Sequence, residues 1–257
     1  MVLKDKTALI TGATSGIGRA CAETFAARGC GLVLAARRLG ALEDLAADLR
    51  KAHGVPVSVH GLDVRDREGV FAFGREVAAR GPVPDVLINN AGLARGMSRI
   101  QEGDVDEWDE MIDTNVKGLL YVTRAILPLM VDRNYGHVVN IGSWAGRMVY
   151  PMGNVYNGTK FAVEALNQAM NLDLVDTGIR VTVIEPGMVR TNFSAVRFGG
   201  DEKRADAVYQ GLTPLSAQDI ADTVRFVVEA PDHVNIQSLT IMPTAQRNSY
   251  VVRRDKK

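Results

Sequence analysis

The chain has 257 residues, of which 46% are hydrophobic and 23% charged, a composition typical of globular proteins and not of disordered or fibrous ones. Lys+Arg and Asp+Glu number 30 each, so no net charge favours nucleic acid or an anionic membrane as a partner. No segment approaches the ~20 apolar residues of a membrane span, and the chain opens on a predicted strand, not on a secretion signal. We therefore expect a cytoplasmic protein with neither partner.

Short β-branched runs alternate with amphipathic stretches along the whole chain. Repeated strand–helix–strand units predict right-handed crossovers and a doubly wound parallel α/β sheet, the Rossmann fold, with helices on both faces. No linker or repeat divides the chain, so we expect one domain over residues 1–257. Strands are predicted at 7–11, 32–35, 57–59, 85–89, 137–141, 180–184 and 238–242, and helices at 17–28, 39–51, 68–80, 104–114, 118–132, from about 156, and at 217–229.

A glycine-rich turn follows the first predicted strand and precedes a helix. Glycine lets the backbone turn sharply and approach a pyrophosphate, while the helix N-terminus offers unpaired N–H groups. The side chains of Thr14 and Ser15 add hydroxyl donors. A tight loop without a ligand is the alternative, but this position between strand and helix favours phosphate binding. The residues concerned are Gly12, Thr14, Ser15, Gly16, Ile17 and Gly18.

The end of the second predicted strand indicates which dinucleotide binds. An NAD site usually has an acidic residue here for the ribose 2′-hydroxyl, whereas this chain has Ala36 followed by Arg37 and Arg38. Arginine binds a 2′-phosphate through bidentate hydrogen bonds and can stack on adenine. The pattern predicts NADP(H) over NAD, with an ordinary solvated turn as the alternative.

Two further segments complete the predicted cofactor site. Asp63, followed by Val64, is suited to accept a hydrogen bond from the adenine amino group, and the alternative is that it caps the next turn. Asn90, Ala91 and Gly92 follow the fourth strand. Small residues there allow a cofactor to lie against the carboxyl edge of the sheet, where ligands bind in open α/β folds.

Four residues have the chemistry of an acid–base site. Tyr156 and Lys160 are four residues apart on a predicted helix and so share one face. An ammonium beside a phenol is expected to lower the phenol's pKa from about 10. Ser143 can hydrogen-bond a substrate oxygen, and Asn115 can hold a water that links Lys160 to solvent. Each pattern is weak alone, but their order along the chain is specific.

These motifs resemble the short-chain dehydrogenases/reductases over essentially the whole chain. The resemblance implies that Asn115, Ser143, Tyr156 and Lys160 form a catalytic tetrad. It also implies that Pro186, Gly187, Val189 and Thr191 surround the nicotinamide, with Tyr156 and Lys160 contacting the cofactor as well. The family is usually dimeric or tetrameric, which implies a homo-oligomer built through the helices after the fourth and fifth strands.

A closer likeness is to the NADP-dependent 3-hydroxy acid (serine/allo-threonine) dehydrogenases, and related carbonyl reductases share several of its stretches. It implies hydride transfer between NADP(H) and a carbonyl or secondary alcohol. A broad-specificity ketone and aldehyde reductase is one alternative, and an NADPH-binding regulator without turnover is another. A sugar-nucleotide epimerase would need a larger C-terminal domain. The likeness rests on residues 111–115, 154–156, 184–187, 196–198, 200–201 and 242–246.

The substrate is a small molecule, expected to contact Ser143, Trp144 and Tyr156. Residues 190–213 form a long polar insertion that is interpreted as a substrate loop or lid, or as a mobile surface loop. Arg147 or Arg197 is a candidate anchor for a substrate carboxylate. The four histidines lack the spacing of a metal site, and we expect no metal.

Overall fold

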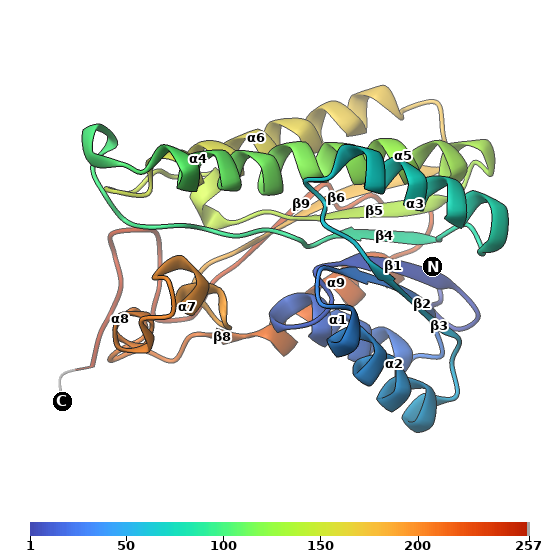
Figure 1. Cartoon of the computed structure of the whole chain (residues 1–257), viewed down its shortest axis with the longest axis horizontal. Helices are drawn as coiled ribbons and strands as arrows, with labels where there is room; N and C mark the ends of the chain where they lie inside the picture. Colours follow the sequence, from blue (N-terminus) through green and yellow to red (C-terminus); the bar gives the residue numbers. More distant parts are fainter. Residues whose placement is uncertain (256–257) are drawn as a thin grey trace.

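The sheet occupies the middle of a three-layer molecule in the computed structural model, which describes residues 1–255 (Figure 1). Its seven strands are parallel and lie in the order β3-β2-β1-β4-β5-β6-β9. The order reverses between β1 and β4, and such a switch point opens a crevice at the carboxyl edge of the sheet. The strands are β1 (Thr7–Thr11), β2 (Gly31–Ala36), β3 (Val57–Gly61), β4 (Val86–Asn89), β5 (Gly136–Ile141), β6 (Ile179–Pro186) and β9 (Ser238–Ile241).

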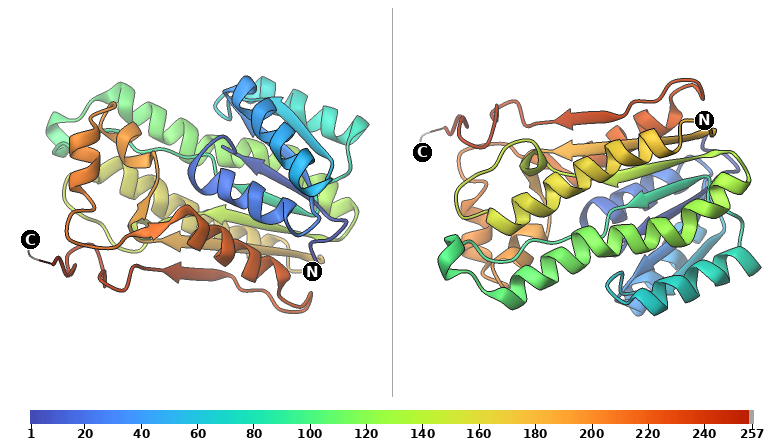
Figure 2. Two further views of the ribbon diagram at one scale, coloured as in Figure 1. Left: turned by 90° about the horizontal axis from the view of Figure 1, so that it is seen from below. Right: turned by 90° about the horizontal axis from the view of Figure 1, so that it is seen from above.

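Helices cover both faces of the sheet, as Figure 2 shows from two sides. Strands covered on both faces are mostly apolar, and β2, β5 and β6 are buried along their whole length. β5 and β6 also bury polar side chains such as Asn140, Arg180 and Glu185. Phe25, Leu42 and Val224 belong to the core on one face, and Phe73 and Ile126 to the core on the other. The first face carries α1 (Gly16–Ala26), α2 (Leu39–His53) and α9 (Ala217–Glu229), and the second α3 (Arg67–Arg80), α4 (Val105–Ile112), α5 (Leu119–Asp132) and α6 (Asn154–Asp173).

The predicted doubly wound parallel sheet is confirmed, and the predicted strands and main helices fall within a few residues of the observed ones. Two predictions about helices were incomplete. The helices predicted at 104–114 and 118–132 are joined by a π-helical turn, η2 (Asp113–Gly118), into one continuous rod. The long helix begins at Asn154, two residues before Tyr156.

The insertion at 190–213 is more ordered than a loop. It contains two short helices, α7 (Phe193–Arg197) and α8 (Glu202–Ala207), and is flanked by the two-stranded ladder of β7 (Val189–Arg190) and β8 (Leu215–Ser216). Figure 1 shows α7 and α8 beyond the carboxyl ends of the strands. We call residues 190–213 the lid segment. The remaining elements are the short 3-10 helices η1 (Ile100–Glu102) and η3 (Trp144–Gly146).

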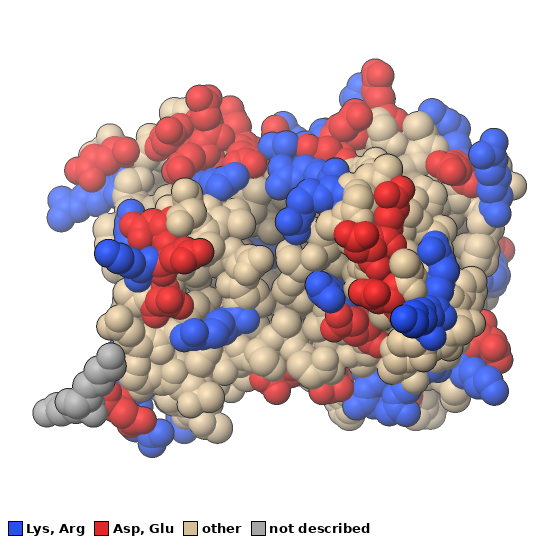
Figure 3. Space-filling view, turned by 60° about the horizontal axis from the view of Figure 1, so that its bottom comes forward, with Lys and Arg blue, Asp and Glu red and all other residues tan. Residues whose placement is uncertain are grey.

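Over residues 1–255, no helix has the length and apolar character needed to cross a membrane. In the same range, no three His, Cys, Asp or Glu side chains form a group able to hold a metal ion. On the face drawn in Figure 3, acidic and basic side chains are interspersed over both halves of the molecule.

Candidate active site

A cleft of about 520 Å³ lies at the switch point of the sheet, beside the carboxyl ends of β1, β4 and β5. It brings together most of the residues that the sequence predicted for cofactor and catalysis. Gly18, Asn115 and Trp144 do not line it. Arg65 lines it without having been predicted, and Phe193 and Val196 line it from within the predicted lid at 190–213. The predicted residues that do so are Gly12, Thr14, Ser15, Gly16, Ile17, Arg37, Arg38, Asp63, Val64, Asn90, Ala91, Gly92, Ser143, Tyr156, Lys160, Pro186, Gly187, Val189 and Thr191.

The glycine-rich turn has the geometry of an anion cradle. Gly12 and Gly16 adopt positive φ, +65° and +55°, which L side chains rarely adopt. A Cβ on Gly12 would lie only 2.9 Å from Asn90 Nδ2. α1 starts at Gly16 without a side-chain cap from Ser15, so its first N–H groups remain available to a phosphate. Gly18 instead allows close packing, because a Cβ there would clash with Gly12 and Asn90.

Asn90 and Thr11 hold the two cleft-forming loops against each other. The Asn90 Nδ2 donates to the Thr11 carbonyl over 2.9 Å, and the Thr11 Oγ1 accepts from the N–H groups of Asn90 (3.1 Å) and Ala91 (3.0 Å). Thr11 is buried and was not predicted as a site residue. These bonds fix the β4 exit loop beside the glycine turn.

Positive charge gathers at the end of the cleft next to β2 and β3. Arg38 donates from Nη2 to the Thr14 Oγ1 over 3.1 Å, and Arg37 and Arg38 are both exposed. Asp63 accepts from the Arg65 side chain at 2.6–3.1 Å and also from the Arg65 N–H at 3.0 Å, so it caps its own turn. Arg65 lowers the pKa of Asp63, and Arg37 contributes to the same shift. The carboxylate is therefore ionised and faces the cleft.

Tyr156 and Lys160 lie on the inner face of α6, and each is only 7% exposed. The Lys160 Nζ donates to the Ile141 carbonyl over 2.9 Å and lies 6.0 Å from the centroid of the Tyr156 ring. Both side chains line the cleft. The sequence prediction that one helical face presents both groups to the carboxyl edge of the sheet is met in the structure.

The expected acidification of Tyr156 is wrong for the chain by itself. Burial raises the pKa of Tyr156 well above its ordinary value, and Tyr150 adds to the rise, whereas Ser143 and Arg197 lower it only in part. Burial also lowers the pKa of Lys160 to about 8. The sequence revealed the spacing of the two groups but not the loss of water around them, and this loss dominates both shifts.

Ser143 and Asn115 differ in how they relate to this pair. Ser143 leads into η3, where its Oγ accepts from the Ala145 N–H over 3.1 Å, and its side chain partly lowers the pKa of Tyr156. Asn115 lies in the π-helical turn and exchanges two 2.8 Å hydrogen bonds with the backbone of Leu93. A Cβ at Gly92 would lie 3.2 Å from the Asn115 Oδ1 and 3.7 Å from the Lys160 Nζ. Asn115 and Lys160 thus flank the same small space.

The two candidate anchors for a substrate anion have different surroundings. Arg147 is paired with Glu185 (Nε–Oε1, 2.7 Å) and Glu164 (3.4 Å). Arg197 lies between two tyrosines, with its Cζ 5.5 Å from the Tyr150 centroid and 5.6 Å from the Tyr156 centroid. The first arginine is neutralised by carboxylates, and the second faces aromatic rings.

One nitrogen of Arg197 is left without a partner. Its Nη1 donates to the Tyr150 hydroxyl over 2.8 Å and its Nε to the Gly96 carbonyl over 3.0 Å. Its Nη2 is buried with no hydrogen-bond partner among the described residues, and the same holds for the Trp144 Nε1. A buried charged donor without an acceptor is costly, so an acceptor supplied by a ligand is the expected resolution.

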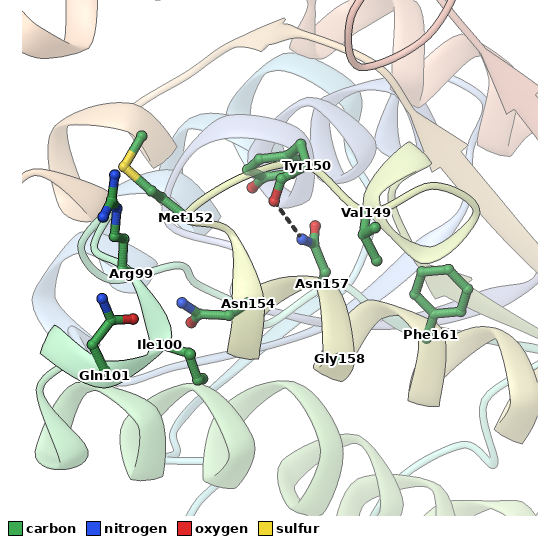
Figure 4. Close-up of a pocket in the computed structure, with 10 residues that line it drawn as sticks. All are labelled: Arg99, Ile100, Gln101, Val149, Tyr150, Met152, Asn154, Asn157, Gly158 and Phe161. Carbon is green, nitrogen blue, oxygen red and sulfur yellow. Dashed lines mark hydrogen bonds between the residues drawn. The ribbon is translucent and has the colours of Figure 1, made fainter.

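The backbone of Tyr150 is hydrogen-bonded to α6, the helix that carries Tyr156. Asn157 on α6 donates from Nδ2 to the Tyr150 carbonyl over 3.1 Å, as Figure 4 shows. The hollow drawn there, of about 500 Å³, shares no lining residue with the catalytic cleft. Apolar side chains of Ile100, Val149 and Phe161 contribute to its wall. Tyr150 itself lines this hollow.

A glycine-rich turn with the geometry of an anion cradle at the switch point of a parallel sheet, together with a buried Tyr–Lys pair beside it, is typical of a dinucleotide-dependent oxidoreductase. The chain belongs to the short-chain dehydrogenase family, whose model matches residues 6–200. It is 43% identical over 249 residues to "Sulfoacetaldehyde reductase 2" of Chromohalobacter salexigens, covering 96% of this chain and 98% of that protein. It is also 43% identical over 239 residues to "NADP-dependent 3-hydroxy acid dehydrogenase YdfG" of Escherichia coli K12, with 93% and 95% covered.

Among solved structures, the chain resembles "The Closed form of serine dehydrogenase complexed with NADP+". The TM-score is 0.90 at 40% sequence identity, covering 97% of this chain and 100% of that one. The likeness therefore extends beyond the family match into the lid segment and the last strand.

Proposed function

We propose that the protein is an NADP(H)-dependent oxidoreductase that interconverts a carbonyl compound and a secondary or primary alcohol, with a short anionic substrate. The observation that carries this proposal is the buried Tyr156–Lys160 pair, with Ser143 beside the phenol, facing a cleft with a glycine-rich anion cradle. The NADP-dependent and NADP-bound relatives support the choice of cofactor.

The residues present fit a dinucleotide with a 2′-phosphate. Gly12, Thr14, Ser15, Gly16 and Ile17 would hold the pyrophosphate at the start of α1. Arg37 and Arg38 would bind the 2′-phosphate, and Asp63 with Val64 the adenine. Bound NADPH would supply the hydride that reduces the carbonyl carbon. Asn90, Ala91, Gly92, Pro186, Gly187, Val189 and Thr191 would form the walls around the nicotinamide half.

Tyr156 and Ser143 handle the oxygen of the substrate. Both hydroxyls donate hydrogen bonds to the carbonyl oxygen and stabilise the negative charge that develops on it. Tyr156 then releases its proton to this oxygen, and the product is the alcohol. Lys160 and a water held at Asn115 return a proton to the phenolate. In the oxidation direction Tyr156 accepts the proton of the alcohol instead.

Arg197 defines the substrate class. Its unpartnered Nη2 belongs to a guanidinium that lies 5.6 Å from the Tyr156 ring, within reach of a charged group one or two bonds from the reacting carbon. A carboxylate or a sulfonate supplies the acceptor that this nitrogen lacks. Names of relatives that include a 3-hydroxy acid and sulfoacetaldehyde favour the same chemistry. Arg147 does not compete for this role, because Glu185 and Glu164 neutralise it.

A spectrophotometric assay of NADPH absorbance tests this proposal. The panel contains 3-hydroxy acids including serine and allo-threonine, sulfoacetaldehyde, neutral aldehydes and aryl ketones, each with NADP(H) and NAD(H). We expect the highest kcat/KM with an anionic substrate and NADP(H). Activity on neutral carbonyls alone would replace the proposal with a broad-specificity ketone and aldehyde reductase. NADPH binding without turnover of any compound would indicate a regulator.

We also propose that the protein is a cytoplasmic homo-oligomer, a dimer or tetramer. Exposed apolar side chains on the outer surfaces of α5 and α6, including Leu120 (38% exposed), Phe161 (41%) and Leu172 (76%), favour contact with a second copy through these helices. Light scattering combined with size-exclusion chromatography measures the mass directly, and a monomer at micromolar concentration would contradict the oligomer. Cell fractionation tests the location.

A further inference from the structure

We infer that Glu110 is a positioning residue that couples the adenine end of the cleft to the lid segment, through a chain of ion pairs formed by Asp63, Arg65, Glu110 and Arg95. The inference rests on the proposed function, since it takes the residues around Asp63 as the adenine subsite. Asp63, Arg65 and Val196 line the same cleft, but Asp63 follows β3 while Val196 belongs to the lid segment.

The chain of ion pairs is continuous. Asp63 binds Arg65 (Oδ2–Nη2, 2.6 Å), Arg65 approaches Glu110 (Nη1–Oε1, 3.4 Å), and Glu110 binds Arg95 (Oε2–Nε, 2.6 Å). Glu110 lies on α4, in the middle of the chain, and contacts both arginines with the same carboxylate. Arg95 is the first cause of the lowered pKa of Glu110, and Arg65 contributes further. The positions of Arg65 and Arg95 therefore both depend on the negative charge of Glu110.

Arg95 clamps the lid segment. Its Nη1 donates to the Val196 carbonyl over 2.8 Å. The neighbouring residue Gly96 donates its N–H to the Arg197 carbonyl over 3.0 Å, and its own carbonyl accepts from the Arg197 Nε, also over 3.0 Å. These three bonds hold the end of α7, and with it the guanidinium of Arg197, whose Cζ lies 5.6 Å from the Tyr156 ring centroid. The position of Arg95 thus determines where the proposed anion anchor lies.

Because Glu110 pairs with both Arg65 and Arg95, the adenine end of the cleft and the lid segment can influence each other. Arg65 occupies both oxygens of Asp63. An adenine amino group that donates to Asp63 competes for these oxygens and shifts Arg65 toward Glu110, where its present contact is long at 3.4 Å. A firmer Arg65–Glu110 pair orients the carboxylate for Arg95, so adenine binding is expected to hold the lid more tightly. By linkage, a held lid favours adenine binding equally.

The test uses 2′,5′-ADP, which carries the adenine and the 2′-phosphate but lacks the nicotinamide half. Hydrogen–deuterium exchange is followed in residues 193–200 at saturating 2′,5′-ADP. In the wild type we expect exchange in this segment to slow about fivefold, equivalent to ~1 kcal/mol, the upper range for a partly exposed ion pair. In Glu110→Gln, Arg65→Ala and Arg95→Ala the slowing should disappear, although 2′,5′-ADP still protects residues 36–38.

Controls separate this inference from a merely structural role and from the proposed function. Asp109→Asn removes the same charge from α4, where Asp109 is exposed and forms no ion pair within the described residues, and it should retain the slowing. NADP+ should still protect the lid in all variants, through the contacts proposed for Thr191. Binding of 2′,5′-ADP with no change in the wild-type lid, or an undiminished change in Glu110→Gln, would overturn the coupling. Failure of both ligands to bind would overturn the proposed function itself.

Discussion

Replacing Arg197 with methionine should change which substrates are used and leave the chemistry of reduction in place. The unpartnered Nη2 is proposed to meet the anionic group of the substrate in a partly buried setting. Loss of one partner of such a charged hydrogen bond costs about 2–5 kcal/mol, and since Arg197 is only partly buried the lower end applies. The kcat/KM for sulfoacetaldehyde should therefore fall about 30- to 100-fold.

The assay compares sulfoacetaldehyde with propanal, a neutral aldehyde of similar size, at saturating NADPH. Arg197→Met also removes the Nε bond to Gly96 and loosens the lid, but this loss affects both aldehydes and cancels in the ratio of their kcat/KM values. Arg190→Met is the matched control, because Arg190 lies in the same lid segment with its side chain 57% exposed. It should leave the ratio unchanged. Equal losses for both aldehydes in Arg197→Met would refute the anchor.

Three further outcomes follow from the site. Tyr156→Phe should lower turnover at least about 100-fold while NADPH binding, measured by its fluorescence, stays within about twofold. Arg38→Ala should raise the KM for NADPH about 10- to 100-fold, the loss of a hydrogen bond to a charged group, and leave the KM for NADH nearly unchanged. Lys160→Met should abolish activity yet stabilise the fold at pH 7 by up to about 3 kcal/mol, because the folded pKa of Lys160 is about 8, below its unfolded value. That gain should vanish in urea unfolding curves as the pH rises from 8 toward 10.5.

The fold could be predicted because its determinants are local and periodic. The buried run of β1 and the amphipathic pattern of α9 each identify their element from a handful of neighbours, and the bounds of both were predicted as they are observed. The lid segment could not be predicted in the same way. α7 has five residues and α8 has six, too few for a 3.6-residue period to repeat, and α7 is held by contacts from a distant loop, such as that of Arg95 with Val196.

The site was predictable in its chemistry but not in its electrostatics. The glycine turn and the Tyr156–Lys160 spacing are properties of the backbone and can be read from the order of residues. Arg65 and Glu110 gave no comparable signal, because each resembles an ordinary surface charge until the structure shows the two 45 positions apart and in contact. Burial is equally invisible in sequence, and it reversed the expected pKa shift of Tyr156.

This reversal has a consequence for the direction of the reaction. Burial raises the pKa of Tyr156, and Lys160 is not among the groups that lower it, so we expect the phenol of the chain by itself to keep its proton at neutral pH. Carbonyl reduction requires Tyr156 in its protonated form, which is already present, whereas alcohol oxidation requires the phenolate form to accept a proton. We therefore expect kcat/KM for carbonyl reduction to be nearly constant between pH 6 and 8, and kcat/KM for alcohol oxidation to rise steadily from pH 7 to 10. The measurement is a pair of pH–rate profiles, and an oxidation profile already level at pH 7 would mean that Tyr156 is ionised there, contrary to its burial.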